Sequence, residues 1–312
     1  MRSLGVTKII RHGVAKRCIR YPMEALLLGI FFGVFRALPI EVASAFGGFI
    51  GRVIGPRLST TTRAIRNLGL VFPEKTNEEY TDIVVGMWDN LGRNAAEFPH
   101  LKEIVTSGDD HVEVVNGELL TALTRNGQSA ILVGAHLANW EISSALERFT
   151  DMKIISVVRK QNNPLTQKMI EHFRRSVGGK QIDKGRHGAK EILSALRSGT
   201  VIGLLFDQKM NDGAPISLFG REAMTPIAPA QMALSVSCAI IPVRVERTGG
   251  VRFRITIYPP VEFAGTGHRH ADAKAIKGAL NERLEEWVRE RPEQWMWLHR
   301  RWAEETYVEA GL

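Results

Sequence analysis

From residue 129 onward, short apolar segments alternate with amphipathic ones, and this alternation constrains the fold more than any other feature of the chain. It is typical of an α/β layer fold with a largely parallel sheet. The expected strands cover residues 130–134, 153–158, 200–206, 239–246 and 251–258. The expected helices cover residues 78–98, 140–148, 164–178, 187–198, 226–237, 271–290 and 293–305. The last two strands flank Gly249-Gly250, which predicts an antiparallel hairpin. We therefore expect a central, mostly parallel sheet flanked by helices.

The N-terminal region has a different character. Residues 1–20 are basic and contain no acidic residue, and the run from Ala25 to Phe35 has no polar side chain. This run is shorter than the roughly 20 apolar residues of a spanning helix. Three interpretations stay open: a membrane anchor with its basic flank on anionic lipid, a signal peptide cleaved near Ala43-Ser44-Ala45, and a buried core helix.

A second apolar segment, residues 42–54, follows the first. Basic residues flank the first run on both sides, so the distribution of positive charge does not fix an orientation. An interfacial anchor, or a span with the short N-terminus outside, fits best. We expect a membrane-associated helical region at 1–60 and one catalytic domain at 61–312.

Charge and cysteine content narrow the function classes. The 312-residue chain carries a net charge of +8, which favours a polyanionic partner. Aromatic and basic residues do not interleave as in nucleic-acid-binding signatures, so an anionic membrane surface is the better interpretation and no nucleic-acid partner is expected. Cys18 and Cys238 are too few and too distant for a disulfide framework or a metal cluster, and reduced thiols fit a protein that faces the cytosol.

The strand expected at 130–134 is followed closely by His136, Asn139, Trp140 and Glu141. Open α/β sheets bind ligands at the carboxyl ends of their strands. His136 and Glu141 are five residues apart, which places them about 140° apart on an ideal helix, unlike the two metal ligands of an HExxH site. The spacing suits a dyad in which Glu141 orients His136 and the other ring nitrogen takes a proton. The alternative is a structural histidine with a surface glutamate.

Two further expected strands end in polar residues. Arg159 follows the strand at 153–158, and Asp207 and Gln208 follow the strand at 200–206. GxSxG is absent, and neither serine nor cysteine stands close to His136 as a nucleophile. A proton taken by His136 would therefore come from a hydroxyl of the substrate.

The segment HLANWE at 136–141 resembles the HX4D/E motif of glycerolipid-type acyltransferases. Further segments extend the likeness: VVRKQNNP at 157–164, the block at 185–208 ending in FDQ, SLFGREAMTPIAPAQMA at 217–233, and RPEQWMWLHRRW at 291–302. Together these segments, over roughly 80–302, resemble the lipid A biosynthesis acyltransferase family, the late lauroyl and myristoyl transferases. The resemblance implies a glycerol-3-phosphate-acyltransferase-like α/β fold.

The resemblance also implies an activity. The family transfers a fatty acyl chain from acyl carrier protein, or from coenzyme A, to a hydroxyl of a lipid A precursor during lipopolysaccharide biosynthesis. His136 would be the general base and Glu141 its partner. Asn139, Arg159, Asp207 and Gln208 would contact substrate, with structural support of the site as the alternative for Asp207 and Gln208. Arg159 and nearby backbone N–H groups are the candidates for stabilising the oxyanion.

The same resemblance places the protein at the inner membrane with the catalytic domain on the cytoplasmic side, and it implies neither a metal nor another cofactor. Two alternatives stay open: an acyltransferase of this family that acts on another glycolipid or a lysophospholipid, and a non-catalytic, membrane-associated lipid-binding protein. The presence of both His136 and Glu141 argues against the second. Three tryptophans near the C-terminus are expected either in the core or as interfacial anchors: Trp295, Trp297 and Trp302.

Overall fold

The computed structural model describes residues 16–125, 127–150, 153–211 and 213–312. Its strands are β1 (Val112–Val115), β2 (Ala130–Gly134), β3 (Ile154–Val158), β4 (Gln181–Asp183), β5 (Val201–Leu205), β6 (Ala214–Leu218), β7 (Arg221–Thr225), β8 (Ala239–Gly249) and β9 (Arg252–Ile257). Its α-helices are α2 (Tyr21–Arg36), α3 (Ile40–Ile54), α4 (Thr61–Val71), α5 (Asn77–Glu97), α6 (Leu101–Thr106), α7 (Glu118–Arg125), α8 (Leu146–Thr150), α9 (Pro164–Arg175), α10 (Arg186–Arg197), α11 (Ala228–Val236), α12 (Arg269–Glu290) and α13 (Glu304–Glu309). Short 3₁₀ segments include η5 (Trp140–Ala145) and η6 (Pro292–Gln294).

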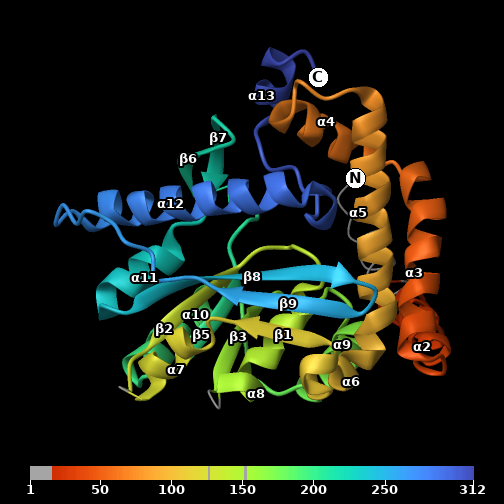
Figure 1. The fold of residues 1–312 in the computed structure, drawn as a ribbon, viewed down its shortest axis with the longest axis horizontal. Helices are drawn as coiled ribbons and strands as arrows, with labels where there is room; N and C mark the ends of the chain where they lie inside the picture. Colours follow the sequence, from red (N-terminus) through yellow and green to blue (C-terminus); the bar gives the residue numbers. More distant parts are fainter. Residues whose placement is uncertain (1–15, 126, 151–152, 212) are drawn as a thin grey trace, which may run out of the picture.

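Within the described residues, seven strands form one sheet in the order β1-β9-β8-β2-β5-β3-β4 (Figure 1). Among the described residues, the pairs β1–β9, β8–β2, β2–β5, β5–β3 and β3–β4 of this sheet are parallel, and only the β8–β9 pair is antiparallel. β6 and β7 form a separate antiparallel ribbon. The predictions of a mostly parallel sheet flanked by helices and of a hairpin at Gly249-Gly250 are therefore confirmed.

The alternation of side chains along β2 divides the core into two layers, because successive residues of a strand point to opposite faces. Ile131 and Val133 pack into a cluster with residues of α5, α11 and α12. Ala130 and Leu132 pack into a second cluster with Leu120 of α7 and other residues from α6 and α8. In Figure 1, α12 accordingly lies above the sheet, and α7 and α8 lie below it.

The two N-terminal helices lie at one end of the sheet, where α3 packs along the outer side of α5 (Figure 1). Glycines allow their backbones to touch: a Cβ added at Gly51 would lie 2.0 Å from the Trp88 carbonyl oxygen, and one added at Gly92 would lie 2.2 Å from that of Gly47. The helical stretch Arg17–Arg36 is long and apolar enough to span a membrane, by length and composition alone, and only 11% of it is buried. It therefore does not fit a buried core helix.

The outer sides of these helices carry large apolar side chains that are exposed to solvent. On α2 they include Met23, Leu26, Leu27, Ile30 and Val34, and on α3 Val42, Phe46, Phe49, Val53 and Ile54. We call these ten residues the apolar face. The basic residues 1–15 lie outside the described part of the chain, and the domain division at residue 60 stays a prediction.

The helix predicted at 293–305 is wrong. The chain forms only the turn η6, then runs without regular structure until α13 begins at Glu304. Trp295 forms a β-bridge with Leu137, and Trp295, Trp297 and Trp302 are all at most 4% exposed. Burial of these large rings in the core, rather than helix propensity, decides the path of this segment. It also excludes them as interfacial anchors.

The other long helices and all five expected strands are found within a few residues of their predicted bounds. The helix expected at 140–148 is divided into η5 and α8. The short strands β1, β4, β6 and β7, with three to five residues each, and the helices α4, α6 and α7 were not predicted. Their apolar runs are too brief for periodicity to reveal them.

Candidate active site

The site lies where β2 and β5 end side by side. Gly134, the last residue of β2, is paired with Leu205, the last residue of β5. Because both strands are parallel, the residues that follow them meet at one edge of the sheet. His136 Nδ1 lies 2.7 Å from Asp207 Oδ1, and the backbone N–H of His136 donates to Asp207 Oδ2 at 2.9 Å. The site thus contains a histidine–carboxylate pair with two contacts.

Asp207 is buried, with only 5% of its surface exposed. Burial by itself raises the pKa of this carboxyl, but the charge and hydrogen bonds of His136, together with the indole N–H of Trp295 at 2.8 Å, outweigh it and hold the pKa well below its usual range. The ionised carboxylate accepts a hydrogen bond from N–H at Nδ1 of His136. When the ring is neutral with its hydrogen on Nδ1, Nε2 carries a lone pair and can act as a base.

Gln208 covers that second nitrogen. Its side-chain Nε2 lies 3.1 Å from His136 Nε2 and 3.0 Å from His299 Nε2. His299 stands at the exposed rim of the site and belongs to the C-terminal segment after η6. In the sequence, His299 lies in the segment RPEQWMWLHRRW, which carries part of the family resemblance but did not predict a site residue. The rings of Trp140 and His299 both meet the His136 ring edge to face, with centroids at 5.0 and 5.8 Å.

The expected pairing of Glu141 with His136 is not found in the structure; Asp207 takes that place. Glu141 instead accepts two hydrogen bonds from Arg174 of α9, at 2.9 and 2.5 Å. The chain turns at Ala138, which has φ +46°, and enters η5 at Trp140. This path carries the Glu141 side chain towards α9 and away from the imidazole.

The other predicted site residues occupy different surroundings. Asn139 is 1% exposed and its amide donates to Glu97 Oε2 at 2.8 Å. Arg159 follows β3, is exposed, and lies near enough to His299 for its charge to lower the pKa of that histidine. Contacts of Asn139 and Arg159 with substrate stay predictions.

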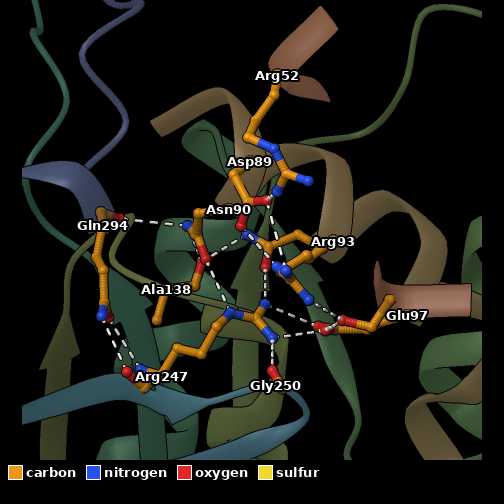
Figure 2. A network of polar contacts seen from close by, with 11 residues as sticks. Arg52, Asp89, Asn90, Arg93, Glu97, Ala138, Arg247, Gly250 and Gln294 are labelled. Carbon is orange, nitrogen blue, oxygen red and sulfur yellow. Dashed lines mark hydrogen bonds and ion pairs between the residues drawn. The ribbon is translucent and has the colours of Figure 1, made fainter. Parts of the chain in front are cut away.

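A buried polar network holds the loop after His136 from behind (Figure 2). The carbonyl of Ala138 accepts hydrogen bonds from the side chains of Asn90 and Asn94 on α5. The Arg247 guanidinium of β8 reaches the same two residues, with Nη2 donating to Asn94 Oδ1 at 2.8 Å. Arg247 also forms an ion pair with Glu97, whose side chain is 0% exposed, with Nη1 and Oε1 at 2.6 Å.

Glu97 and Gln294 extend this network in two directions. Glu97 Oε1 accepts the hydroxyl of Ser44 on α3 at 2.6 Å. Gln294 of η6 exchanges two hydrogen bonds of 2.9 Å with the backbone of Arg247, and its carbonyl accepts the N–H of Ala138 at 3.0 Å. The loop between β2 and η5 is therefore fixed to α5, β8 and the C-terminal segment.

Behind Asp207 lie two buried cations. Lys277 of α12 is 1% exposed, its Nζ lies 4.3 Å from the centre of the Phe206 ring, and no hydrogen-bond partner for it exists among the described residues. Burial lowers the pKa of Lys277 to about 7, with a contribution from Arg301 and an opposing one from Asp207. Arg301, also 1% exposed, donates to the carbonyl of Met224 and the hydroxyl of Thr225.

Within residues 16–125, 127–150, 153–211 and 213–312, no group of three or more histidine, cysteine, aspartate or glutamate side chains could hold a metal ion.

Comparisons with known proteins place this site in a family. The lipid A biosynthesis lauroyltransferase of Escherichia coli (strain K12) is 25% identical over 292 residues, which cover 90% of this chain and 92% of that protein. A phosphatidylinositol mannoside acyltransferase of Mycobacterium tuberculosis is 25% identical over 205 residues, 64% of this chain and 60% of that protein. The crystal structure of a 1-acyl-sn-glycerophosphate acyltransferase from Thermotoga maritima aligns with a TM-score of 0.36 and 13% identity, covering 75% of this chain and 98% of that one. That likeness is too low to add to the argument.

The family match is broader. The model of the family described as bacterial lipid A biosynthesis acyltransferase matches residues 15–304, up to the first residue of α13. The matched range includes both members of the His136–Asp207 pair and the C-terminal segment with His299. The chain belongs to the bacterial lipid A biosynthesis acyltransferase family and is an acyltransferase.

Proposed function

We propose that the protein transfers a fatty acyl chain from a thioester to a hydroxyl of a lipid A precursor, with His136 as the general base. The observation that carries this proposal is the 2.7 Å contact between His136 Nδ1 and the buried, ionised Asp207. It leaves Nε2 free to accept a proton. The carboxylate partner in this proposal is Asp207, and Glu141 acts through Arg174.

The proposed acyl transfer needs no nucleophile from the protein. The substrate hydroxyl gives its proton to His136 Nε2 while its oxygen forms a bond to the thioester carbonyl carbon. Asp207 stabilises the resulting imidazolium. The tetrahedral intermediate then collapses, the C–S bond breaks, and the proton passes from Nε2 to the leaving thiolate. The products are an ester and a free thiol.

Charge supports anionic substrates. Acyl carrier protein, coenzyme A and a phosphorylated lipid A precursor are all anionic, and the chain has a net charge of +8. Arg63 and Arg159 are exposed and lie close enough to His299 to lower its pKa. They therefore provide a positive rim at the site. We propose acyl carrier protein as the donor, with coenzyme A as the alternative.

The apolar face supports attachment to a membrane. Lipid A acyltransferases are membrane-associated, and α2 and α3 expose ten large apolar side chains on their outer sides. Apolar surface on this scale, next to a basic flank, favours insertion into the interface or the bilayer. We propose that the protein sits at the inner membrane with the catalytic domain on the cytoplasmic side, where an acyl donor from fatty acid synthesis is available.

A second candidate acceptor is another glycolipid. The similarity to the mycobacterial phosphatidylinositol mannoside acyltransferase favours this candidate over a lysophospholipid. Mass spectrometry of the lipids of cells that lack this protein separates the two. Loss of one defined acyl chain from lipid A supports the first candidate, and unchanged lipid A together with an altered glycolipid supports the second.

The mechanism is tested with purified protein, acyl carrier protein thioester and a lipid A precursor. We expect transfer by the wild type and a loss of about 10²–10⁴-fold in His136→Ala, the range of a general base. Cys238→Ala, at a half-buried position in the loop before β8, is the matched control and should stay active. Full activity of a folded His136→Ala would reject His136 as the base. Absence of transfer by the wild type would favour a lipid-binding role without catalysis.

A further inference from the structure

The side chain of Gln208 joins the base of the site to its rim. Its Nε2 atom lies within 3.1 Å of Nε2 of both His136 and His299. His136 is largely enclosed, with a 12% exposed side chain, whereas His299 is exposed. Gln208 therefore occupies the place from which a substrate hydroxyl must approach His136.

The protonation states of the two rings fix how Gln208 is oriented. In the neutral ring, the form that can act as a base, the hydrogen sits on Nδ1 and faces Asp207, so His136 Nε2 accepts. The atom of Gln208 that faces it must therefore be the amide nitrogen, since the amide oxygen there would meet a lone pair. A primary amide nitrogen has two hydrogens, so it donates one to His136 and one to His299.

His299 is suited to remain an acceptor at neutral pH. Although the residue is exposed as a whole, its imidazole is partly desolvated, and this lowers its pKa, as does the neighbouring His136. Arg63 and Arg159 act in the same direction, while Asp207 acts against them. A neutral His299 still accepts a hydrogen bond from the Gln208 amide, and so holds it in place, when a substrate hydroxyl replaces Gln208 at His136.

We propose that Gln208, positioned by His299, donates its second N–H to the oxyanion that forms on the thioester carbonyl. The arriving hydroxyl takes over Nε2 of His136 and frees this N–H. Its nitrogen lies 3.1 Å from the base and so stands close to the reacting atoms, as an oxyanion donor must. The inference rests on the proposed acyl transfer. In that transfer the C–O bond forms, the C–S bond breaks, and the proton moves through His136 to the thiolate.

Several other donors near His136 are already used. The backbone N–H of His136 donates to Asp207, that of Leu137 to Ala135, and that of Ala138 to Gln294. The Trp295 indole donates to Asp207. Arg159, the candidate from the sequence, is exposed to solvent. Gln208 is the donor whose side-chain nitrogen lies 3.1 Å from Nε2 of His136.

The test measures kcat and KM of Gln208→Met with acyl carrier protein thioester and lipid A precursor. Methionine keeps the length of the side chain and removes the donor. We expect kcat to fall by about 10²–10³-fold, with KM changed less than about threefold, because the interaction forms only in the transition state. Gln128→Met, at an exposed position, is the matched control and should match the wild type.

Three results would overturn the inference: an unchanged kcat in Gln208→Met, a raised kcat, which would mean that Gln208 only caps the base, or a raised KM with kcat unchanged. If Gln208→Met does not fold, as judged by its thermal transition, Gln208→Glu replaces it and is expected to lose at least as much kcat. The outcome for the proposed function is separate. Full activity of His136→Ala overturns the general base, whereas an inactive His136→Ala beside a fully active Gln208→Met overturns only the role of Gln208.

His299 is tested as a positioning residue by rescue. His299→Gln can place an amide oxygen where the imidazole Nε2 accepts, whereas His299→Leu cannot accept at all. We expect His299→Leu to lose about 10-fold or more in kcat and His299→Gln to recover most of it, while in the Gln208→Met background both substitutions have little further effect. Equal losses in His299→Leu and His299→Gln would overturn the positioning role.

Discussion

The loop from His136 to Asn139 has two sides that differ in how their polar groups are satisfied. On the rear side, the buried Glu97 and Arg247 each make several hydrogen bonds and pair with each other. On the front side, Nε2 of His136 has its hydrogen-bond contact with the side chain of Gln208. The buried amine of Lys277, near Asp207, has no hydrogen-bond partner in the described part of the chain.

The difference reflects two roles: the rear side holds the loop in position, and the front side takes part in the reaction. A buried ion pair with all its hydrogen bonds made resists rearrangement, because removal of either partner leaves an uncompensated charge. A catalytic pair must instead exchange protons and accept a new ligand. The rear network therefore holds the loop in a single geometry, and the front side keeps the groups whose bonding changes during the reaction.

The sharpest test of the front side is Asp207→Asn. An amide at this position can face His136 with its N–H and favour the wrong tautomer, as in the serine protease triad, where the same change costs about 10⁴-fold in kcat. We expect a loss of that order in acyl transfer with a folded protein. Asp183→Asn, at the exposed end of β4, is the control. A loss of less than tenfold in Asp207→Asn would mean that another carboxylate is the catalytic partner of His136.

The rear side is tested by Glu97→Leu. This change leaves the Arg247 charge buried and unpaired, so the free energy of unfolding should fall by about 3–5 kcal/mol. The double variant Glu97→Leu, Arg247→Met removes both charges and should recover most of that loss. Chemical denaturation measures both. Glu113→Leu breaks the exposed pair with Arg254 and should cost less than about 1 kcal/mol. Equal effects at the buried and exposed pairs would contradict the comparison.

A double-mutant cycle decides whether Glu141 acts through Arg174 or directly on His136. If Glu141 acts through Arg174, then Glu141→Gln, Arg174→Met and the double variant should each lose a similar factor in kcat/KM, about 10–100-fold, with a coupling of about 1–3 kcal/mol. If Glu141 acts on His136 directly, the double variant should lose the product of the two single effects. Steady-state acyl transfer measures the four proteins of the cycle.

The smallest effect is expected at Lys277. Its folded pKa is lowered to about 7, so between about pH 7 and the ordinary lysine pKa near 10.4 the unfolded chain binds more protons than the folded one. The stability of the wild type should therefore rise with pH in this window and decline as the pH falls through it.

Lys277→Met should remove that slope and raise the free energy of unfolding at pH 7 by about 1–2 kcal/mol, because it removes an amine that is buried without a partner. Urea denaturation at several pH values measures the change. Lys274→Met, half-buried on the same helix, is the control and should keep the wild-type slope. A slope that survives Lys277→Met would show that the unpartnered amine is not its source.

The sequence was sufficient for the elements that depend on local pattern. Apolar runs and 3.6-residue periodicity located the strands beside His136 and Asp207 and the long helices α5, α9 and α12. The site residues after β2, β3 and β5 could be proposed because polar groups that follow buried strands lie at the ligand-binding edge.

The sequence was not sufficient for relations that depend on strand order and on distant contacts. The pairing of His136 with Asp207 requires β2 and β5 to be neighbours, although β3 and β4 lie between them in the sequence. His299 reaches the site only because Trp295 and Trp297 are buried in the core and prevent the helix that local propensity predicts. The direction of Glu141 depends on the turn at Ala138, a non-glycine residue with positive φ.

The glycine contact between α3 and α5 has a consequence for substrate selection. Backbones that touch at Gly47, Gly51 and Gly92 set the spacing between α3 and α5, and α5 also carries Asn90 and Asn94, which hold the loop after His136. On a bilayer reached through the apolar face, the imidazole would therefore stand at one fixed height above the lipid. The protein would then select among chemically equivalent hydroxyls by the distance of each one from the membrane plane.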